Sequence, residues 1–190
     1  MSGPGVVNPL RPLLILDLDE TLIHASETEL AHTPDFLIAP YALYLRPGVA
    51  GFLEQMAQHY ELAVWTSSSP AYARAVVARL FAEPERLAFT WASDRCTLRR
   101  DLESDTWCQS KPLHKLRRRG YDLRRVLVVD DSPEKHTRNY GNLIAVRPFE
   151  GDPADDELPR LGRYLQQLAG EPDFRRLEKR GWWRTGAAQA

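Results

Sequence analysis

Short, mostly apolar runs recur along the chain, and polar residues follow each of them. Continuous runs without polar alternation are typical of strands that are buried on both faces, as in a parallel sheet between layers of helices. These runs therefore predict strands of one such sheet. They lie at residues 13–16, 61–65, 87–91, 126–129 and 143–146.

Helical periodicity separates several of these runs. Apolar residues recur three and four positions apart from Val49 to Tyr60, which predicts an amphipathic helix. A second helix is predicted from Ser69, which can cap it with Pro70 at the first position, to Leu80. Further helices are expected at 113–119, which is short and basic, and at 158–168. The alternation of strands and helices predicts an α/β fold.

Other segments depart from this alternation. Apolar runs at 36–38 and 43–45 predict two short strands, which form a small β insertion at about residues 25–45, after the first strand. Residues 1–12 are expected to be a loose lead-in, and residues 93–110 to be irregular.

The chain ends in a basic, aromatic tail at about 171–190. Trp182 and Trp183 are expected to pack back on the domain, because two exposed tryptophans would be costly.

Length and composition indicate one domain over residues 1–190, with a formal net charge of −1. This charge gives no global attraction to nucleic acid or to a membrane. Two cysteines, twelve residues apart, form neither a zinc motif nor a disulfide framework. With no long apolar run and no signal-peptide pattern, we expect a cytoplasmic protein and a monomer.

Paired carboxylates follow two of the predicted strands. Asp17 and Asp19 come after the first, and Asp130 and Asp131 come after the run at 126–129. Ligands bind at the carboxyl edge of open α/β sheets, so these side chains are expected to meet there. Carboxylates at short range repel one another, and Mg²⁺ would relieve that repulsion. An Asp-rich turn alone would explain one such pair, but two strands with the same ending favour a metal site.

Hydroxyls and a lysine follow other strands. Thr66 and Ser67 begin a hydroxyl-rich loop after the strand at 61–65, and Lys111 precedes the short basic helix. Hydroxyls before a helix start can hold a phosphate oxygen, and a lysine can neutralise its charge. Alone, the loop is an ordinary helix cap and Lys111 is one more exposed base. Beside the acidic pairs they predict a site for phosphoryl transfer, with a carboxylate as nucleophile.

These motifs resemble those of the haloacid dehalogenase (HAD) superfamily, and more narrowly of the FCP/SCP phosphatases, which act on the C-terminal domain of RNA polymerase II. The sequence DLDETL at 17–22 is similar to the first motif, and WTSS at 65–68 to the second. Lys111 fits the third motif, and VVDDSP at 128–133 fits the fourth. The resemblance covers about residues 11–170.

The resemblance implies a Rossmann-like HAD fold, with a mainly parallel central sheet flanked by helices, and Mg²⁺-dependent hydrolysis of phosphomonoesters through an aspartyl phosphate. Asp17 would be the nucleophile and Asp19 the general acid and base. Thr66, Ser67 and Lys111 would bind the phosphoryl group. The metal would be held by the Asp17 side chain, the Asp19 carbonyl and the pair Asp130 and Asp131, with Asp131 in direct contact. The insertion would shape a substrate groove, lined by Tyr41, Tyr44 and Phe36.

The resemblance favours a phosphorylated protein or peptide as substrate, and hence a protein Ser/Thr phosphatase. One alternative is a HAD phosphatase that acts on a small metabolite or on a nucleic-acid phosphate end. The compact insertion favours a large substrate, and the net charge argues against nucleic acid. A more remote alternative is a non-catalytic phospho-Asp signalling module, in which the lysine would instead come last in the chain.

Overall fold

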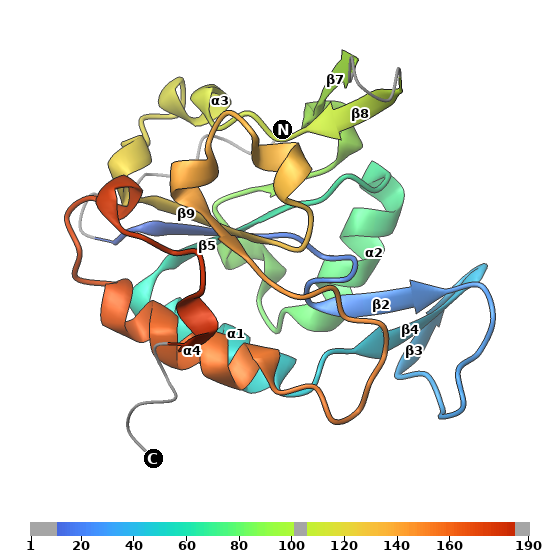
Figure 1. The fold of residues 1–190 in the computed structure, drawn as a ribbon. Helices are drawn as coiled ribbons and strands as arrows, with labels where there is room; N and C mark the ends of the chain where they lie inside the picture. The colour runs from blue at the N-terminus through green and yellow to red at the C-terminus, as the bar shows by residue number, and fades with distance from the viewer. Residues whose placement is uncertain (1–10, 101–105, 185–190) are drawn as a thin grey trace.

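A central parallel sheet organises the computed structural model, which describes residues 11–100 and 106–184. All four strand pairings in this sheet are parallel. The predicted α/β fold with a mainly parallel sheet is therefore confirmed (Figure 1). In spatial order the strands are β10 (Leu143–Ala145), β9 (Val126–Asp130), β1 (Leu13–Leu16), β5 (Glu61–Trp65) and β6 (Thr90–Trp91).

The central strands are buried on both faces, because alternate side chains enter two different hydrophobic clusters. Leu14 and Leu16 of β1 join one cluster, and Leu13 and Ile15 join the other. All four are at most 1% exposed. This burial on both faces explains why β1 has no polar position.

Three helices cover the face that Leu14 and Leu16 line. They are α1 (Val49–His59), α2 (Pro70–Leu80) and α4 (Glu157–Leu168), which all contribute to the same cluster. The short helix α3 (His114–Arg117) packs Leu116 into the cluster on the opposite face. Within the described ranges, no helix has the length and apolar character needed to cross a membrane.

The predicted β insertion is present, but it contains a strand that the apolar pattern did not reveal. An antiparallel sheet of order β2-β4-β3 is formed by β2 (Ile23–Ser26), β4 (Tyr41–Leu45) and β3 (Phe36–Ile38). We expected only the last two strands. Beyond Ile23, β2 carries a histidine, an alanine and a serine that are half-buried, so burial left no continuous apolar signal in it.

The expectation of an irregular segment at 93–110 was wrong. Its described part contains an antiparallel pair, β7 (Thr97–Arg100) and β8 (Trp107–Ser110), which projects from the domain in Figure 1. Leu98 and Trp107 are more than 60% exposed. Backbone pairing, and not burial, therefore forms this ribbon, and hydrophobic periodicity does not detect it. The predicted strand at 87–91 is also shorter, since β6 has two residues.

The described part of the tail packs against α4. Trp182 is 3% exposed, stacks on Tyr164 of α4, and donates from Nε1 to the carbonyl of Ala145 at 2.8 Å. Trp183 is 45% exposed. Packing was therefore predicted correctly for Trp182 and wrongly for Trp183. The tail beyond residue 184 and most of the predicted lead-in lie outside the described residues.

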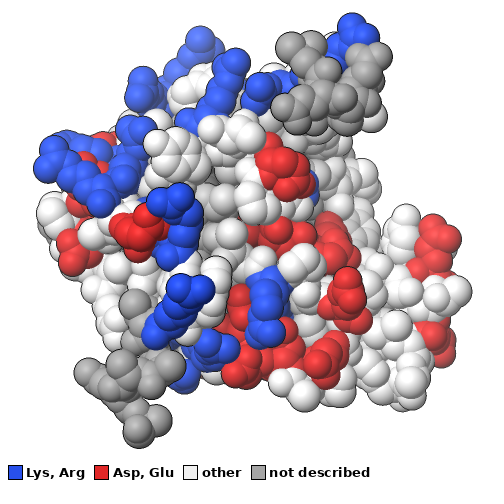
Figure 2. Space-filling view, in the orientation of Figure 1, with Lys and Arg blue, Asp and Glu red and all other residues white. Residues whose placement is uncertain are grey.

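The small net charge is the sum of separate patches. In Figure 2, basic side chains gather at the upper left, over α3, and acidic side chains gather in the lower centre and over the insertion sheet. No lysine or arginine occurs between Arg11 and Arg46, a stretch that contains the first acidic pair and the insertion. Basic and acidic side chains therefore gather over different elements of this face.

The strand order places two carboxyl ends side by side at the point where the chain reverses direction across the sheet. From β1 the chain runs outward through β5 and β6, and it then returns to the other side of β1 to form β9 and β10. Such a switch point leaves room for a ligand between neighbouring strand ends. Here β1 leads into Asp17, and β9 ends with Asp130.

Candidate active site

Asp17 is the first residue after β1 and lies at the switch point. Its backbone N–H donates to the carbonyl of Val129 at 3.0 Å, which continues the pairing with β9. Its Oδ1 accepts a hydrogen bond from the N–H of Leu18 at 2.9 Å, and the residue is only 2% exposed. The backbone of Asp17 is therefore fixed by β9, and one carboxylate oxygen is fixed by the N–H of Leu18.

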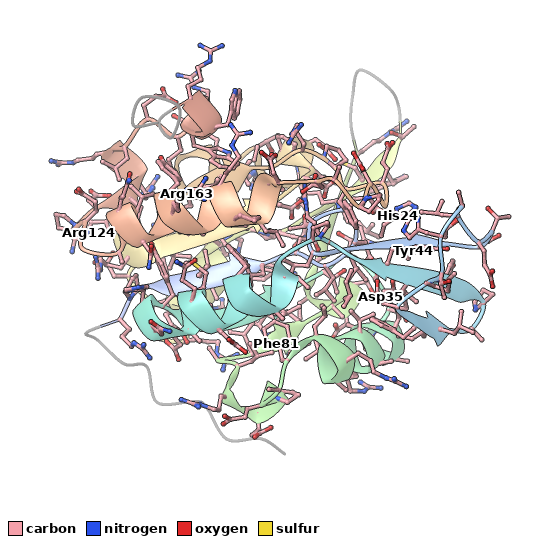
Figure 3. All side chains as sticks on the ribbon, turned by 90° about the horizontal axis from the view of Figure 1, so that it is seen from below. His24, Asp35, Tyr44, Phe81, Arg124 and Arg163 are labelled. Atoms are coloured by element: carbon pink, nitrogen blue, oxygen red, sulfur yellow. The ribbon has the colours of Figure 1, made fainter. Side chains whose placement is uncertain are left out.

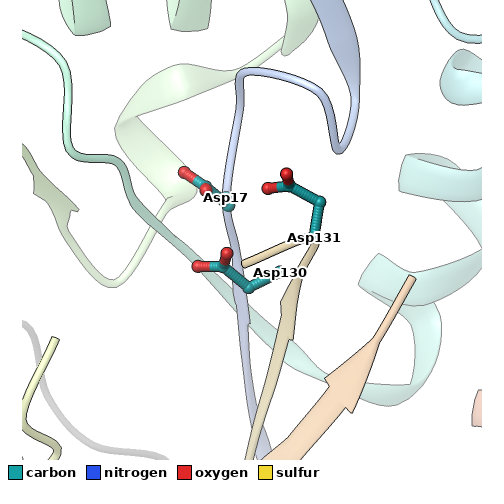
Figure 4. Close-up of side chains that lie close together, drawn as sticks. All are labelled: Asp17, Asp130 and Asp131. Carbon is teal, nitrogen blue, oxygen red and sulfur yellow. The ribbon is translucent and has the colours of Figure 1, made fainter. Parts of the chain in front are cut away.

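Three carboxylates converge at this point. One oxygen atom from each of Asp17, Asp130 and Asp131 lies within 4.8 Å of the other two. Figure 4 shows the three side chains close together. Three neighbouring carboxylates repel one another, and a hard divalent cation is the partner that their oxygens prefer. Burial together with Asp130 raises the pKa of Asp17 to about 7, and burial and Asp130 also raise the pKa of Asp131. The donor set therefore fits a magnesium ion.

Lys111 bridges two of these acids from the interior of the protein. Its Nζ lies 2.6 Å from Oδ2 of Asp130 and 2.9 Å from Oδ2 of Asp17, and its side chain is fully buried. Burial disfavours the charged amine, but Asp17 and Asp130 outweigh this effect and raise the pKa of Lys111. The predicted lysine thus lies beside Asp17, the predicted nucleophile, and its charge is shared between two carboxylates.

His136 and Asn139 fix Asp130 in turn. Asn139 donates from Nδ2 to Nδ1 of His136 at 3.1 Å, so the proton of a neutral ring lies on Nε2, which faces Oδ2 of Asp130 at 2.9 Å. The N–H of Ser132 donates to the other Asp130 oxygen at 2.9 Å. Burial opposes ionisation of Asp130, but Lys111 and His136 hold its pKa below the usual range. Asp130 is therefore ionised, and its carboxylate is held in place by hydrogen bonds.

Asp19 turns away from the acid cluster and toward hydroxyl groups. Ser68 and Tyr72 donate to its Oδ2 and Oδ1 at 2.6 and 2.7 Å, and Thr66 donates to Oδ2 at 3.3 Å. Its carboxylate is not part of the acid cluster, although it lines the same cavity as Asp17. This position separates the carboxylate of Asp19 from the three carboxylates that could hold a metal ion.

The hydroxyls of the loop after β5 serve different purposes. Thr66 is 1% exposed, and its hydroxyl both donates to Asp19 and accepts from the N–H of Ser68 at 3.0 Å. The Ser67 hydroxyl is buried at the cavity wall and meets no hydrogen-bond partner among the described residues, although the Cys96 thiol lies nearby. The Ser67 side chain therefore lies at the cavity wall with its hydroxyl oxygen turned away from solvent.

An open cavity of about 510 Å³ is lined by Asp17, Asp19 and the hydroxyl-rich loop after β5. Glu20, whose backbone is left-handed with φ of 56°, lies at its wall. Burial and the nearby Asp19 and Asp131 raise the pKa of Glu20 to about 7. The cavity is thus rich in acids. Its wall consists of Asp17, Asp19, Glu20, Ala25, Tyr41, Thr66, Ser67, Ser68, Ser69, Tyr72 and Lys135.

The insertion contributes less to this cavity than we expected. Tyr41 lines the cavity and meets Tyr72 edge-on at 6.0 Å. Tyr44 is instead buried, and its hydroxyl accepts from the N–H of Leu30 at 2.7 Å (Figure 3). Phe36 lies under the guanidinium of Arg79, 5.9 Å from its ring centre. The prediction that Tyr44 and Phe36 also line the groove was therefore wrong.

A buried ion pair holds the turn after the first acidic pair. Arg46 is fully buried and binds both carboxylate oxygens of Asp155, at 2.8 and 2.9 Å. It also donates to the carbonyl of Thr21 at 3.0 Å. The N–H of Phe149 donates to the carbonyl of Glu20 at 2.7 Å. The turn that carries Asp19 is thus fastened from the insertion and from the loop before α4.

Sequence reasoning did not identify several residues of this site. Tyr72, Lys135, His136 and Asn139 lie on one face of α2, in a short turn and in a loop, where no motif separates them from ordinary polar residues. Their spacing along the sequence carries no signal, because each acts through a contact with a residue from another strand. The sequence shows a histidine six residues after Asp130, but its burial, which indicates its role, is visible only in the structure.

Comparison with known proteins identifies relatives across most of the chain. A family model described as NLI interacting factor-like phosphatase matches residues 12–175. The chain is 30% identical over 188 residues to "CTD nuclear envelope phosphatase 1B" of Danio rerio, which covers 91% of this chain and 73% of that protein. It is 31% identical over 168 residues to "Carboxy-terminal domain RNA polymerase II polypeptide A small phosphatase 1" of Homo sapiens, which covers 84% and 60%.

One similar protein has a different kind of name. The chain is 35% identical over 173 residues to "Mitochondrial import inner membrane translocase subunit TIM50" of Phytophthora infestans, which covers 89% of this chain and 37% of that protein. Among solved structures, the fission yeast RNA polymerase II CTD phosphatase Fcp1 bound to beryllium fluoride matches with a TM-score of 0.65 at 20% identity. This match covers 84% of this chain and 63% of that one, and it indicates a common fold.

Proposed function

Because the chain belongs to the NLI interacting factor-like phosphatase family, with the HAD-like fold of Fcp1, we propose that it is a Mg²⁺-dependent phosphatase for phosphoserine or phosphothreonine in proteins. The observation that carries this proposal is the position of Asp17. It lies in an open cavity, between buried Lys111 and an acidic pair that fits a metal ion. A nucleophilic carboxylate needs these partners to attack an anionic phosphoryl group.

The reaction has two steps. In the first, an oxygen of Asp17 attacks phosphorus, the bond between phosphorus and the ester oxygen breaks, and Asp19 gives its proton to the leaving alkoxide. In the second, Asp19 takes a proton from water, the hydroxide attacks phosphorus, and the bond to Asp17 breaks. Inorganic phosphate leaves, and both carboxyls return to their first state.

The surrounding groups support these roles. Lys111 keeps a positive charge at Asp17, and Asp130 and His136 hold Lys111 in place. Ser67 lines the cavity, where we expect it to bind a phosphoryl oxygen, and the Thr66 hydroxyl lies between the Asp19 carboxylate and the backbone of Ser68. Preorganised donors of this kind stabilise the charge that develops on the transferred group.

A magnesium ion would be held by Asp17 and Asp131, with the carbonyl of Asp19 as a further ligand. Asp131 suits direct contact because it is half-buried and its carboxylate makes only long hydrogen bonds, at 3.3 and 3.5 Å. Asp130 suits a supporting role, since both of its oxygens already accept strong hydrogen bonds. When bound, the metal would supply a Lewis acid for the phosphoryl oxygens.

A protein substrate suits the shape of the site. The insertion sheet lies beside the strand ends in Figure 1, and it adds only Ala25 and Tyr41 to the cavity wall. A cavity of about 510 Å³ that remains open can admit a phosphorylated side chain that stays attached to its backbone. A small metabolite or a nucleic-acid phosphate end is the alternative substrate. A monomer in the cytoplasm stays our prediction for the state and location of the chain.

A second candidate function is phosphate-dependent binding without turnover. The similarity to a protein named as a translocase subunit favours it, because that name describes no hydrolysis. The intact set of Asp17, Asp19, Lys111 and the acidic pair favours catalysis. A measurement of turnover separates the two functions.

The test is hydrolysis of p-nitrophenyl phosphate with Mg²⁺ and with EDTA, beside a panel of phosphoserine, phosphothreonine and phosphotyrosine peptides. We expect turnover that needs the metal and falls at least about a thousandfold in Asp17→Asn, which keeps the shape but removes the nucleophile. Asp122→Asn, at an exposed ion pair, is the control and should keep full activity. Metal-independent turnover, or activity of Asp17→Asn near wild type, would disprove the proposal.

A further inference from the structure

Lys135 is the one cation that lines the cavity, as far as the described residues show. Its Nζ lies 3.8 Å from Oδ2 of Asp17, and its side chain is 23% exposed. Lys111 lies 2.9 Å from the same oxygen but is fully buried. Two lysines therefore approach one carboxylate oxygen, and only Lys135 does so from the side that a substrate can reach.

The backbone around Lys135 is well fixed. The residue belongs to the 3₁₀ turn Pro133–His136, its N–H donates to the carbonyl of Ser132 at 3.1 Å, and its carbonyl accepts from the N–H of Lys111 at 2.9 Å. The next residue, His136, points inward to Asp130. This short turn thus places two groups at successive positions: an amine that faces the cavity and a buried histidine that contacts Asp130.

The charges of the site leave a role for this amine. Lys111 is already paired with Asp17 and Asp130, so its charge is largely neutralised before substrate arrives. A phosphomonoester dianion must then enter a cavity that also contains Asp19 and Glu20. The Nζ of Lys135 lies beyond hydrogen-bond distance of Asp17. Its N–H groups are therefore available to phosphoryl oxygens, for which they would form charge-assisted hydrogen bonds.

We propose that Lys135 is a further catalytic residue, which binds a non-bridging oxygen of the phosphoryl group in the substrate, in the transition state and in the product phosphate. The inference rests on the proposed function, and it assigns different roles to the two lysines. Lys111 holds the carboxylates of Asp17 and Asp130 together from its buried position. Lys135 neutralises the negative charge of the transferred phosphoryl group from the cavity.

The test compares Lys135→Met, Lys135→Arg and the wild type, with Mg²⁺ present, in p-nitrophenyl phosphate kinetics and in competitive inhibition by inorganic phosphate. We expect Lys135→Met to lower kcat/KM by about 10- to 100-fold and to weaken phosphate inhibition by about tenfold. Lys135→Arg should restore part of both losses. Lys115→Met is the matched control, because Lys115 is also half-buried but contacts the carbonyl of Arg95, outside the cavity.

The phosphate inhibition constant distinguishes contact with the phosphoryl group from mere support of Asp17. If Lys135→Met lowers kcat but leaves phosphate inhibition within twofold of wild type, Lys135 does not touch the phosphoryl group and the inference is wrong. The rise in Tm caused by inorganic phosphate gives a second reading that needs no turnover. An inactive wild type would refute the proposed function, whereas a phosphate-induced rise that is equal in wild type and Lys135→Met would refute only the role of Lys135.

Discussion

The Tyr72 hydroxyl donates a 2.7 Å hydrogen bond to Oδ1 of Asp19. This contact joins α2 to the turn after β1, and it orients the carboxyl that we propose as general acid and base. Burial and the nearby Asp19 raise the pKa of Tyr72, so the phenol stays a donor throughout the physiological range. The contact therefore links a residue without any motif to the predicted chemistry.

Tyr72→Phe should lower kcat/KM by about tenfold, because it removes one of three hydroxyl donors to Asp19. The loss should be larger for an alkyl phosphate than for p-nitrophenyl phosphate, whose leaving group needs little protonation. Kinetics with both substrates measure this difference. Tyr140→Phe, at a side chain that is 81% exposed, is the control. Equal losses for both substrates would argue against an acid role for Asp19.

Magnesium should raise the Tm more at pH 7.5 than at pH 5.5. A carboxyl whose pKa is raised by folding, as that of Asp17 is to about 7, destabilises the metal-free protein as pH rises from about 4 toward 7. Below pH 7 protons also compete with the metal for this carboxylate. At 100 times the dissociation constant, we expect a rise of roughly 5–10 °C at pH 7.5.

The matched variants for this experiment are Asp131→Asn and Glu27→Gln. Asp131→Asn removes a proposed direct ligand and should abolish the magnesium-induced rise in Tm. Glu27 is an exposed carboxylate of the insertion, so its variant should respond as the wild type does. A full response in Asp131→Asn would mean that the ion binds elsewhere.

Asp155→Asn should destabilise the fold by about 3 kcal/mol, because it leaves the fully buried guanidinium of Arg46 without its counter-charge. Burial opposes ionisation of Asp155, but hydrogen bonds from Arg46 and from the N–H of Glu157 lower its pKa. Its contribution is therefore present above the usual aspartate pKa, and it is lost as pH falls through the lowered value. Urea unfolding at pH 7 and at pH 3 should show a smaller difference between variant and wild type at pH 3.

Asp122→Asn is the control for this pair. The ion pair between Asp122 and Arg124 has side chains that are 48% and 65% exposed, so its loss should leave the unfolding free energy nearly unchanged. Equal effects of the two substitutions would show that burial does not strengthen the pair at Arg46.

Trp182→Ala should lower the free energy of unfolding by about 3–5 kcal/mol, because it removes a buried ring that stacks on Tyr164 and a hydrogen bond to β10. Trp183→Ala, at a neighbouring ring that is 45% exposed, should cost about 1 kcal/mol or less. Thermal unfolding of both variants measures the contrast. Similar losses would mean that the tail is held by Trp183 as strongly as by Trp182.

Burial explains which elements the sequence revealed. The strands at 13–16 and 126–129 are buried on both faces, so every position in them is apolar and the pattern is unmistakable. The pair β7 and β8 and the strand β2 are held by backbone hydrogen bonds, and most of their side chains are half-buried or exposed. Backbone pairing places no demand on residue type, and hydrophobic periodicity cannot detect it.

By itself, the sequence determined that apolar strands deliver Asp17, Asp19, Asp130 and Asp131 to one edge of a parallel sheet. Strand direction and the cost of burying charge are local properties that one segment can express. Only the tertiary structure decided that the Asp19 carboxylate turns to hydroxyls, and that Lys111 is fully buried and shared between two carboxylates. Contacts such as that of Lys135 with Asp17 join residues more than a hundred positions apart, and only folding brings them together.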